Sequence, residues 1–367
     1  MKPPAPSHWL EANQQHLMAR LNSVRRALEL RLDRDRNPPP LSSSAQSLPP
    51  ESTPPDPDAE PPAAPAKTGS PPEPLFALDV GCAAFGLSPF ERDLLLLCAG
   101  PSLDSKFGGL IAALQGDSRS TSPTFSLALG TLPGAHWSAL SPAGPLRRWH
   151  LLEVGSGEIL TNAPLRIDER VLHFLTGVNG LDDRLQALVQ PIGPADDLPA
   201  SQTDLARRIA RVLTRGRPDR VLPIIQLGGS DPAGRRTVAA AACTALGFCL
   251  HALRASDVPV AAPERDSLAR LWEREAVLGR AALLLELDEM EETELARGVA
   301  PFLDSIRGLV LVSKRDPWRA RHRPVLRFEV TKPTLAEQKQ LWEQTLGSAA
   351  ECLDGQLDRI VTQFSLG

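Results

Sequence analysis

The chain has 367 residues, 42% of them hydrophobic, and a formal net charge of −4. This length allows roughly two or three domains, and the slightly acidic charge argues against a protein that covers nucleic acid with positive charge. Five scattered cysteines form no C-x-x-C pair, and no run of 18 uncharged apolar residues is present, so we expect reduced thiols, no metal cluster, no membrane partner and a cytoplasmic location.

The first predicted element is an amphipathic helix within residues 1–36. Its large apolar residues recur at spacings of three, four and seven, and Ser7 is placed as an N-cap. The apolar positions are Leu10, Leu17, Leu21, Val24, Leu28 and Leu32. A seam this narrow either pairs with another helix as a short coiled coil or packs on the chain's own body.

Residues 37–74 form a proline-rich segment. They hold 14 of the 36 prolines, and Leu41 and Leu48 are their large apolar residues. Because such a segment cannot bury a core, we expect a disordered linker with polyproline II character. A proline-rich ligand for a partner domain is the alternative.

The pattern of residues 75–194 predicts helices followed by a hairpin. Ser88, Pro89 and Glu91 supply the N-cap, the first-turn proline and the capping-box glutamate of one helix. Further helices are expected at 104–114, 124–132, near 136 and at 167–177, and strands at 148–154 and 159–166. This order is typical of a winged-helix (α+β) domain.

A winged helix often binds DNA through a recognition helix. The segment expected in that place, residues 123–132, contains no Lys, Arg, Asn or Gln. Arg147 and Arg148 alone do not make a phosphate-binding face. We therefore expect a structural or protein-contact role, with no sequence-specific DNA partner.

Residues 203–346 alternate between helix and strand. Helices are expected at 203–216, after the loop that follows the first strand, at 265–278 and from 334, where Thr334 is the N-cap and Glu337 stands at N3. Strands are expected at 221–227, 248–253, 281–287, 308–312 and 326–330. Regular alternation predicts an α/β domain with a mainly parallel sheet between two helical layers. Residues 347–367 then form the truncated start of a helical lid.

The first strand of this domain leads into a candidate phosphate-binding loop. Gly229 and Gly234 stand four residues apart, which matches the G-x-x-x-x-G part of a P-loop. The residues between them are Ser230, Asp231, Pro232 and Ala233. Backbone N–H groups and the positive end of the next helix would bind the phosphates of ATP or ADP. A glycine turn common to many α/β proteins is the alternative.

The end of the motif differs from a P-loop. Arg235 and Arg236 replace the Lys and the Ser or Thr, and the first hydroxyl comes one position late, at Thr237. Arg235 can still bind phosphate oxygens. A cation at position 236 disfavours Mg²⁺, so we expect weak nucleotide binding with little help from the metal.

Two further groups complete the predicted site. Asp288 and Glu289 follow an apolar strand as the acidic pair of a Walker B element would, to hold Mg²⁺ and orient a water. Glu286 leaves that register open, and a charged helix start is the alternative. Ser313 ends the next strand, where it could contact a terminal phosphate. The basic residues 314–323 either reach a neighbouring subunit's nucleotide or form a solvated loop.

The order of these elements resembles an AAA-type ATPase module. Residues 75–346 more closely resemble the winged-helix AAA ATPases encoded beside bacterial phage-tail-like contractile injection systems, through LSPFERDLLLLCAG, DERVLHFLTG and KPTLAEQKQLW. The resemblance implies a first AAA unit with a degenerate P-loop, and a second, intact unit, which does not follow here. The chain is then either a fragment or shortened product, or a degenerate module acting alone.

These observations define the expected function. We expect a nucleotide-binding AAA-type module with weak or no hydrolysis that serves assembly or remodelling of a protein complex. Its partners would be other subunits or an AAA partner. An active ATP-hydrolysing remodelling enzyme is the alternative, and a winged-helix module without nucleotide is a further one.

Overall fold

The computed structural model describes residues 6–37, 76–157, 159–195, 198–215, 222–288 and 290–347. The predicted linker and the predicted start of the lid fall almost wholly outside these ranges. Two compact units are present: Met1–Leu146 with Leu152–Asp168 and Leu175–Gly177, and Arg147–Leu151 with Glu169–Phe174 and Val178–Gly367. None of the described helices is long and apolar enough to cross a membrane alone, although the bent pair of helices Pro89–Leu103 and Lys106–Gln115 passes that test by length and composition.

The first unit is mainly helical. Its elements are α1 (Pro6–Arg36), α2 (Ala77–Phe85), α3 (Pro89–Leu103), α4 (Lys106–Gln115), α5 (Phe125–Thr131), η1 (Trp137–Leu140), β1 (Leu152–Val154), η2 (Leu160–Asn162) and β2 (Leu165–Ile167). Two short helices, α6 (Pro145–Arg148) and α7 (Glu169–Leu175), continue into the second unit. β1 and β2 pair antiparallel.

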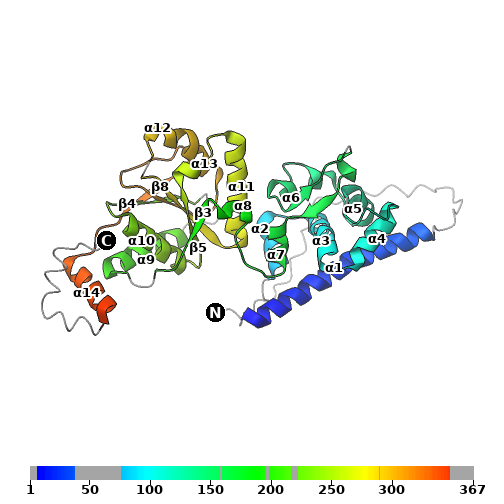
Figure 1. Cartoon of the computed structure of the whole chain (residues 1–367), viewed down its shortest axis with the longest axis horizontal. Helices are drawn as coiled ribbons and strands as arrows, with labels where there is room; N and C mark the ends of the chain where they lie inside the picture. Colours follow the sequence, from blue (N-terminus) through cyan, green and yellow to red (C-terminus); the bar gives the residue numbers. More distant parts are fainter. Residues whose placement is uncertain are drawn as a thin grey trace, which may run out of the picture. The chain divides into compact units, whose positions relative to one another are not determined.

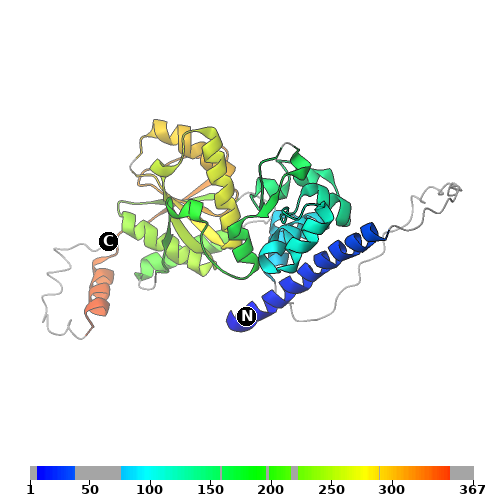
Figure 2. The same cartoon turned by 45° about the vertical axis from the view of Figure 1, so that its right-hand side comes forward.

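The helix α1 packs on its own unit. Its predicted seam is buried at Leu17, Leu21, Val24 and Leu28, and the helix contacts α3, α4 and α5. Figure 2 shows it lying along these helices. Buried Asn13 adds two polar contacts, since its amide donates to Leu175 O (2.9 Å) and accepts from Ala77 N (2.9 Å). The intramolecular alternative is therefore the one that the structure adopts.

One local prediction in this unit is confirmed and two are wrong. Ser88 and Glu91 form the expected capping box of α3. Ser7 is not an N-cap, because α1 already begins at Pro6, whose fixed φ suits a first turn. The predicted strands are much shorter than expected. Pro145 starts the helical turn α6, and His150 then takes a left-handed φ of 49°, so extended backbone begins only at Leu152.

The second unit holds a six-stranded sheet in the order β3-β5-β6-β7-β4-β8. Its strands are β3 (Val189–Ile192), β4 (Ile224–Gly228), β5 (Cys249–Arg254), β6 (Ala281–Glu286), β7 (Val310–Ser313) and β8 (Val325–Glu329). All neighbours pair parallel except β3, which pairs antiparallel with β5. The expected mainly parallel α/β sheet is confirmed. The sequence analysis missed β3, whose Pro191 is tolerated because β3 is an edge strand.

Helices cover both faces of this sheet (Figure 1). The helices of the second unit are α8 (Asp183–Gln186), α9 (Ala200–Thr214), α10 (Pro232–Ala245), η3 (Ala255–Asp257), α11 (Ala262–Leu278), α12 (Glu292–Glu294), the π-helical turn η4 (Leu295–Val299), α13 (Ala300–Ser305) and α14 (Leu335–Leu346). Successive strand residues alternate between two cores. Leu283 and Leu285 face the core with α11 and α13, whereas Leu284 faces the core with α9 and α10.

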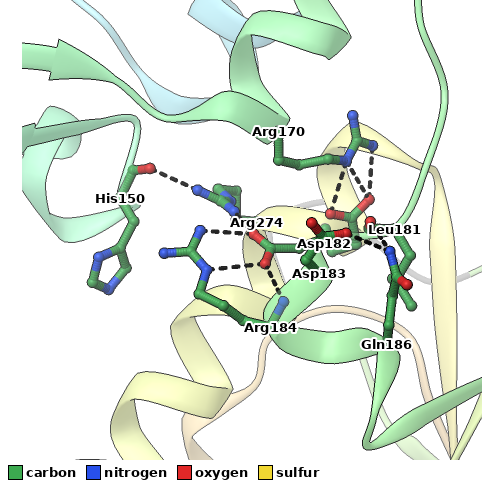
Figure 3. A network of polar contacts seen from close by, with 9 residues as sticks. His150, Arg170, Leu181, Asp182, Asp183, Arg184, Gln186 and Arg274 are labelled. Carbon is green, nitrogen blue, oxygen red and sulfur yellow. Dashed lines mark hydrogen bonds and ion pairs between the residues drawn. The ribbon is translucent and has the colours of Figure 1, made fainter.

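A buried polar network joins α11 to α7, His150 and Asp182, which precede it in the sequence (Figure 3). Arg170 of α7 pairs with Glu275, with Nη2 2.7 Å from Oε1, and the two side chains are 6% and 2% exposed. Arg274 donates to the carboxylate of Asp182 and to His150 O. Burial alone would raise the pKa of Asp182, but hydrogen bonds from Arg184 and the nearby arginine charges hold it below its ordinary value.

Glu275→Gln should destabilise the second unit by about 3 kcal/mol, because it removes the carboxylate charge that pairs with the buried Arg170 guanidinium. Hydrogen exchange of the α11 amides measures this loss within the unit. Glu264→Gln on the exposed start of the same helix is the matched control, with an expected change below about 0.5 kcal/mol. Equal changes in the two variants would contradict the role given to the ion pair.

Candidate functional site

The connection between β4 and α10 is shorter than a phosphate-binding loop. Gly229 takes a φ of +119°, and a Cβ there would lie 2.2 Å from Val330 O, so only glycine fits. The helix α10 already begins at Pro232, with Asp231 as its N-cap. The sequence analysis expected loop backbone from Gly229 to Gly234. Residues 232–234 are helical instead, because a proline after an Asp cap starts a helix efficiently.

The N-terminus of α10 carries a carboxylate from the chain itself. Asp231 is 9% exposed, and its Oδ1 accepts a hydrogen bond from Ala233 N at 3.0 Å. A Cβ on Gly234 would lie 2.5 Å from Asp231 Oδ2, so Gly234 makes room for that side chain. The positive end of the helix is therefore already balanced by a negative group. A phosphate placed there would be repelled by Asp231.

Arg235 lies at the centre of the site and is only 1% exposed. Its Nε donates to Ser313 Oγ at 2.8 Å, and its other nitrogens donate to Gly229 O and to the carboxylate of Asp288. The structure therefore brings together the predicted residues Arg235, Asp288 and Ser313. The guanidinium expected to meet phosphate oxygens binds protein groups instead.

Asp288 has both carboxylate oxygens engaged. Oδ2 accepts from Arg235, and Oδ1 accepts from Arg315 N at 2.8 Å, while the side chain is 33% exposed. Its strand β6 is separated from β4 by β7. Arg235 reaches Asp288 past the end of β7 because its side chain is long. Glu289 lies outside the described residues.

The remaining loop-end residues also bind protein groups. Arg236 lies 3.7 Å from Glu286, and both side chains are partly exposed. Thr237 Oγ1 donates to Gly234 O at 3.0 Å, as a hydroxyl in a first helical turn commonly does. Glu286 therefore pairs with Arg236, and Asp288 pairs with Arg235. Of the two acidic residues that the sequence left open for this position, Asp288 is the one that contacts Arg235.

Gln226 is a site residue that sequence reasoning missed. It is 1% exposed in β4, its Nε2 donates to Asp316 O at 2.7 Å, and its Oε1 accepts from Trp318 N at 3.2 Å. These contacts fix the segment that brings Arg315 N to Asp288. The sequence contains a signal for this residue, because Gln226 is a polar residue within an otherwise apolar strand.

The basic segment 314–323 divides into buried and exposed residues. Arg323 is 7% exposed and donates to the carbonyl oxygens of Leu222 and Ile306, both at 2.6 Å. Burial lowers its pKa from the ordinary value. It therefore holds β4 and the end of α13 together and is not free for a neighbouring subunit. Arg315 and Arg319 are exposed.

The helix α14 is attached to the start of α9. Thr334 and Glu337 form the predicted capping box. The Glu337 carboxylate also accepts a hydrogen bond from Ser201 N at 2.8 Å. Hydrogen bonds from the backbone of Ser201 and Thr334 lower the pKa of Glu337 to about 2. One carboxylate thus caps two helices at once.

The residues present do not fit Mg²⁺. Asp288 spends both oxygens on protein donors, and Arg236 occupies the position of the metal-binding hydroxyl. Within the described ranges no group of three or more His, Cys, Asp or Glu could hold a metal ion. They fit nucleotide phosphates poorly too, since Asp231 caps α10 and Arg235 is buried in its own ion pair.

The helix expected to recognise DNA is α5. It begins at Phe125 with Thr124 as its N-cap, and it carries no basic or amide side chain. Arg31 of α1 donates to Gly130 O on this helix. The contacts of α5 are therefore with its own unit, and nothing in its composition reads bases.

Comparisons with known proteins identify two parts of the chain. Residues 74–189 match the family described as "Winged helix domain, variant", and residues 334–367 match the "Contractile injection system ATPase helical domain". Each of these parts agrees with the resemblance drawn from the sequence. No curated protein matches the chain.

One solved structure with a similar chain is that of the E. coli MS115-1 HORMA:CdnC:Trip13 complex. The identity is 12% and the TM-score 0.33, and the match covers 48% of this chain and 79% of that chain. We draw no conclusion about function from a likeness of that score.

The carboxyl group of Glu337 should remain ionised as the pH falls through 4.5, its ordinary pKa, and should titrate near 2. A lowered pKa in the folded state adds stability above pH 4.5 that is lost as the pH falls toward 2. The ¹³C shift of the carboxyl carbon, assigned with Glu337→Gln, measures this directly. Thr334→Ala should raise the midpoint. A midpoint near 4.5 in the unchanged protein would contradict the double capping.

Proposed function

We propose that the second unit is an AAA-like module of a contractile injection system ATPase that supports assembly or remodelling of a protein complex. We further propose that it binds ATP or ADP weakly, independently of Mg²⁺, and does not hydrolyse ATP at a useful rate. The matches to a winged helix domain and to the ATPase helical domain support the family assignment. They say nothing about nucleotide.

The topology of the sheet supports the AAA-like part of the proposal. β4 lies inside the sheet, between β7 and the edge strand β8, and α10 is the next element after β4. The carboxyl ends of β4, β6 and β7 face one edge, which is where ligands bind in open parallel sheets. Asp288 and Ser313 lie at that edge, beside the first turn of α10. Polar residues therefore stand at the positions that a nucleotide site uses, although their chemistry differs from that of an active P-loop site.

The contact between Arg235 and Asp288 carries the proposal of weak binding. In an active P-loop site, the carboxylate at the strand end pairs with the metal ion, and the basic side chain of the loop pairs with the phosphates. Here the two side chains neutralise each other. A nucleotide would have to break a buried ion pair and displace the Asp231 cap, and both changes cost free energy.

The same charge arrangement argues against catalysis. Hydrolysis needs a metal beside the leaving phosphate and a carboxylate free to orient water. Asp288 has no free oxygen for either task, since both accept hydrogen bonds. We therefore favour an assembly role over the alternative of an active remodelling enzyme.

Titration calorimetry with ATP should give a Kd weaker than about 0.1 mM, which corresponds to about −5.5 kcal/mol. The value should be the same with Mg²⁺ and with a chelator. Arg235→Lys combined with Arg236→Thr recreates the G-x-x-x-x-G-K-T sequence, so it should tighten binding and make it depend on magnesium. A matched control is Arg319→Lys, at an exposed position outside the site.

Tight binding by the unchanged chain that disappears with the chelator would contradict the proposal. A phosphate-release assay on the same samples completes the test. Turnover above background that is lost in Asp288→Asn would favour the active-enzyme alternative.

A further inference from the structure

An open cavity of about 740 Å³ lies beside the Arg235 network. It is lined by the end of β5, η3 and the residues after it, the end of β6 and the residues after it, α12 and the turn η4, together with Pro232 at the start of α10 and Ser313 at the end of β7. A volume of this size suits a small organic ligand or a few side chains of a peptide. The cavity belongs entirely to the second unit.

The apolar wall of the cavity is formed by Val260 and Met290. Val260 is 70% exposed and Met290 is partly buried, whereas Val258 and Val299 of the same lining are 5% and 0% exposed. The π-helical turn η4 contributes Arg297, Gly298 and Val299 to the lining, and such turns recur at functional sites. The apolar surface that a ligand can contact is therefore that of Val260 and Met290.

The polar part of the lining leaves positive charge available. Arg254 and Arg297 line the cavity, are exposed, and have no ion-pair partner among the residues that the structure describes. The acidic groups of the lining are largely committed, since Asp288 is paired with Arg235 and Glu286 with Arg236. Glu294 is the remaining acidic residue of the lining. An anion can therefore meet two guanidinium groups and one opposing carboxylate.

We infer that this cavity binds an apolar anion, with the hydrocarbon or aromatic body against Val260 and Met290 and the acidic head between Arg254 and Arg297. The inference does not rest on the proposed function, because neither arginine belongs to the Arg235 network, although Asp288 and Ser313 of that network also line the cavity. The same chemistry is offered by a free organic acid and by a peptide in which an acidic side chain follows an apolar one.

The fluorescent anion 8-anilinonaphthalene-1-sulfonate tests the inference on the full chain. It should bind saturably, and Arg254→Gln with Arg297→Gln should weaken its binding at least about tenfold. Binding of the neutral analogue N-phenyl-1-naphthylamine should weaken by less than about threefold in the same variant. Val260→Ser should weaken both probes, because it removes apolar wall. Arg319→Gln is the control for a lost surface charge and should leave the binding of both probes unchanged.

Competition against the bound sulfonate separates the two sources. Displacement by octanoate identifies a site for free acids, and displacement by the capped peptide Leu-Glu-Leu identifies a site for a protein segment. Displacement by neither, or unchanged binding of the anion in the double arginine variant, would overturn the inference. Loss of both probes in Arg319→Gln would overturn it too, since the binding would then lie elsewhere.

Discussion

The buried guanidinium of Arg235 joins three segments that are far apart in the sequence. It begins on the first turn of α10, and it donates to Asp288 at the end of β6 and to Ser313 at the end of β7. A charge that is 1% exposed is tolerated only when it is paired and fully hydrogen-bonded. The positions of α10, β6 and β7 at this edge of the sheet therefore depend on the contact.

Other parts of the second unit serve the same edge. Gln226 holds the segment 314–318, which brings Arg315 N to the second oxygen of Asp288. Arg323 binds carbonyl oxygens between β4 and α13, and Glu337 links α14 to α9. In each case a polar side chain within the unit satisfies backbone groups that would otherwise be unpaired. The described part of the site is held together by the protein's own groups.

Much of the fold could be predicted because local signals agreed with the packing. The alternation of helix and strand after Thr203, the capping boxes at Ser88 and Thr334, and the seam of α1 all appear in the structure. The strands β1 and β2 were overestimated, because the left-handed His150 and the helical turns α6 and η2 leave no sequence pattern. β3 was missed because its short run contains Pro191.

The residues of the candidate site could be predicted, but their partners could not. Arg235, Asp288 and Ser313 were each chosen for their place after a strand or loop, and parallel strands bring such places together. Sequence spacing does not show whether a guanidinium turns toward a ligand or toward a carboxylate of its own chain. That choice depends on the strand order, in which β7 separates β6 from β4, and on the early start of α10 at Pro232.

A double-mutant cycle between Arg235 and Asp288 tests the central claim most directly. The free energy of opening of the β7 amides would be measured by hydrogen exchange in the unchanged protein, Arg235→Met, Asp288→Asn and the double variant, first without nucleotide and then with Mg²⁺ and ATP. If the two side chains neutralise each other in the resting protein, the coupling should be about 2 kcal/mol, and Mg²⁺ should not change it. Additive losses, or a coupling that appears only with Mg²⁺ and ATP, would contradict the account.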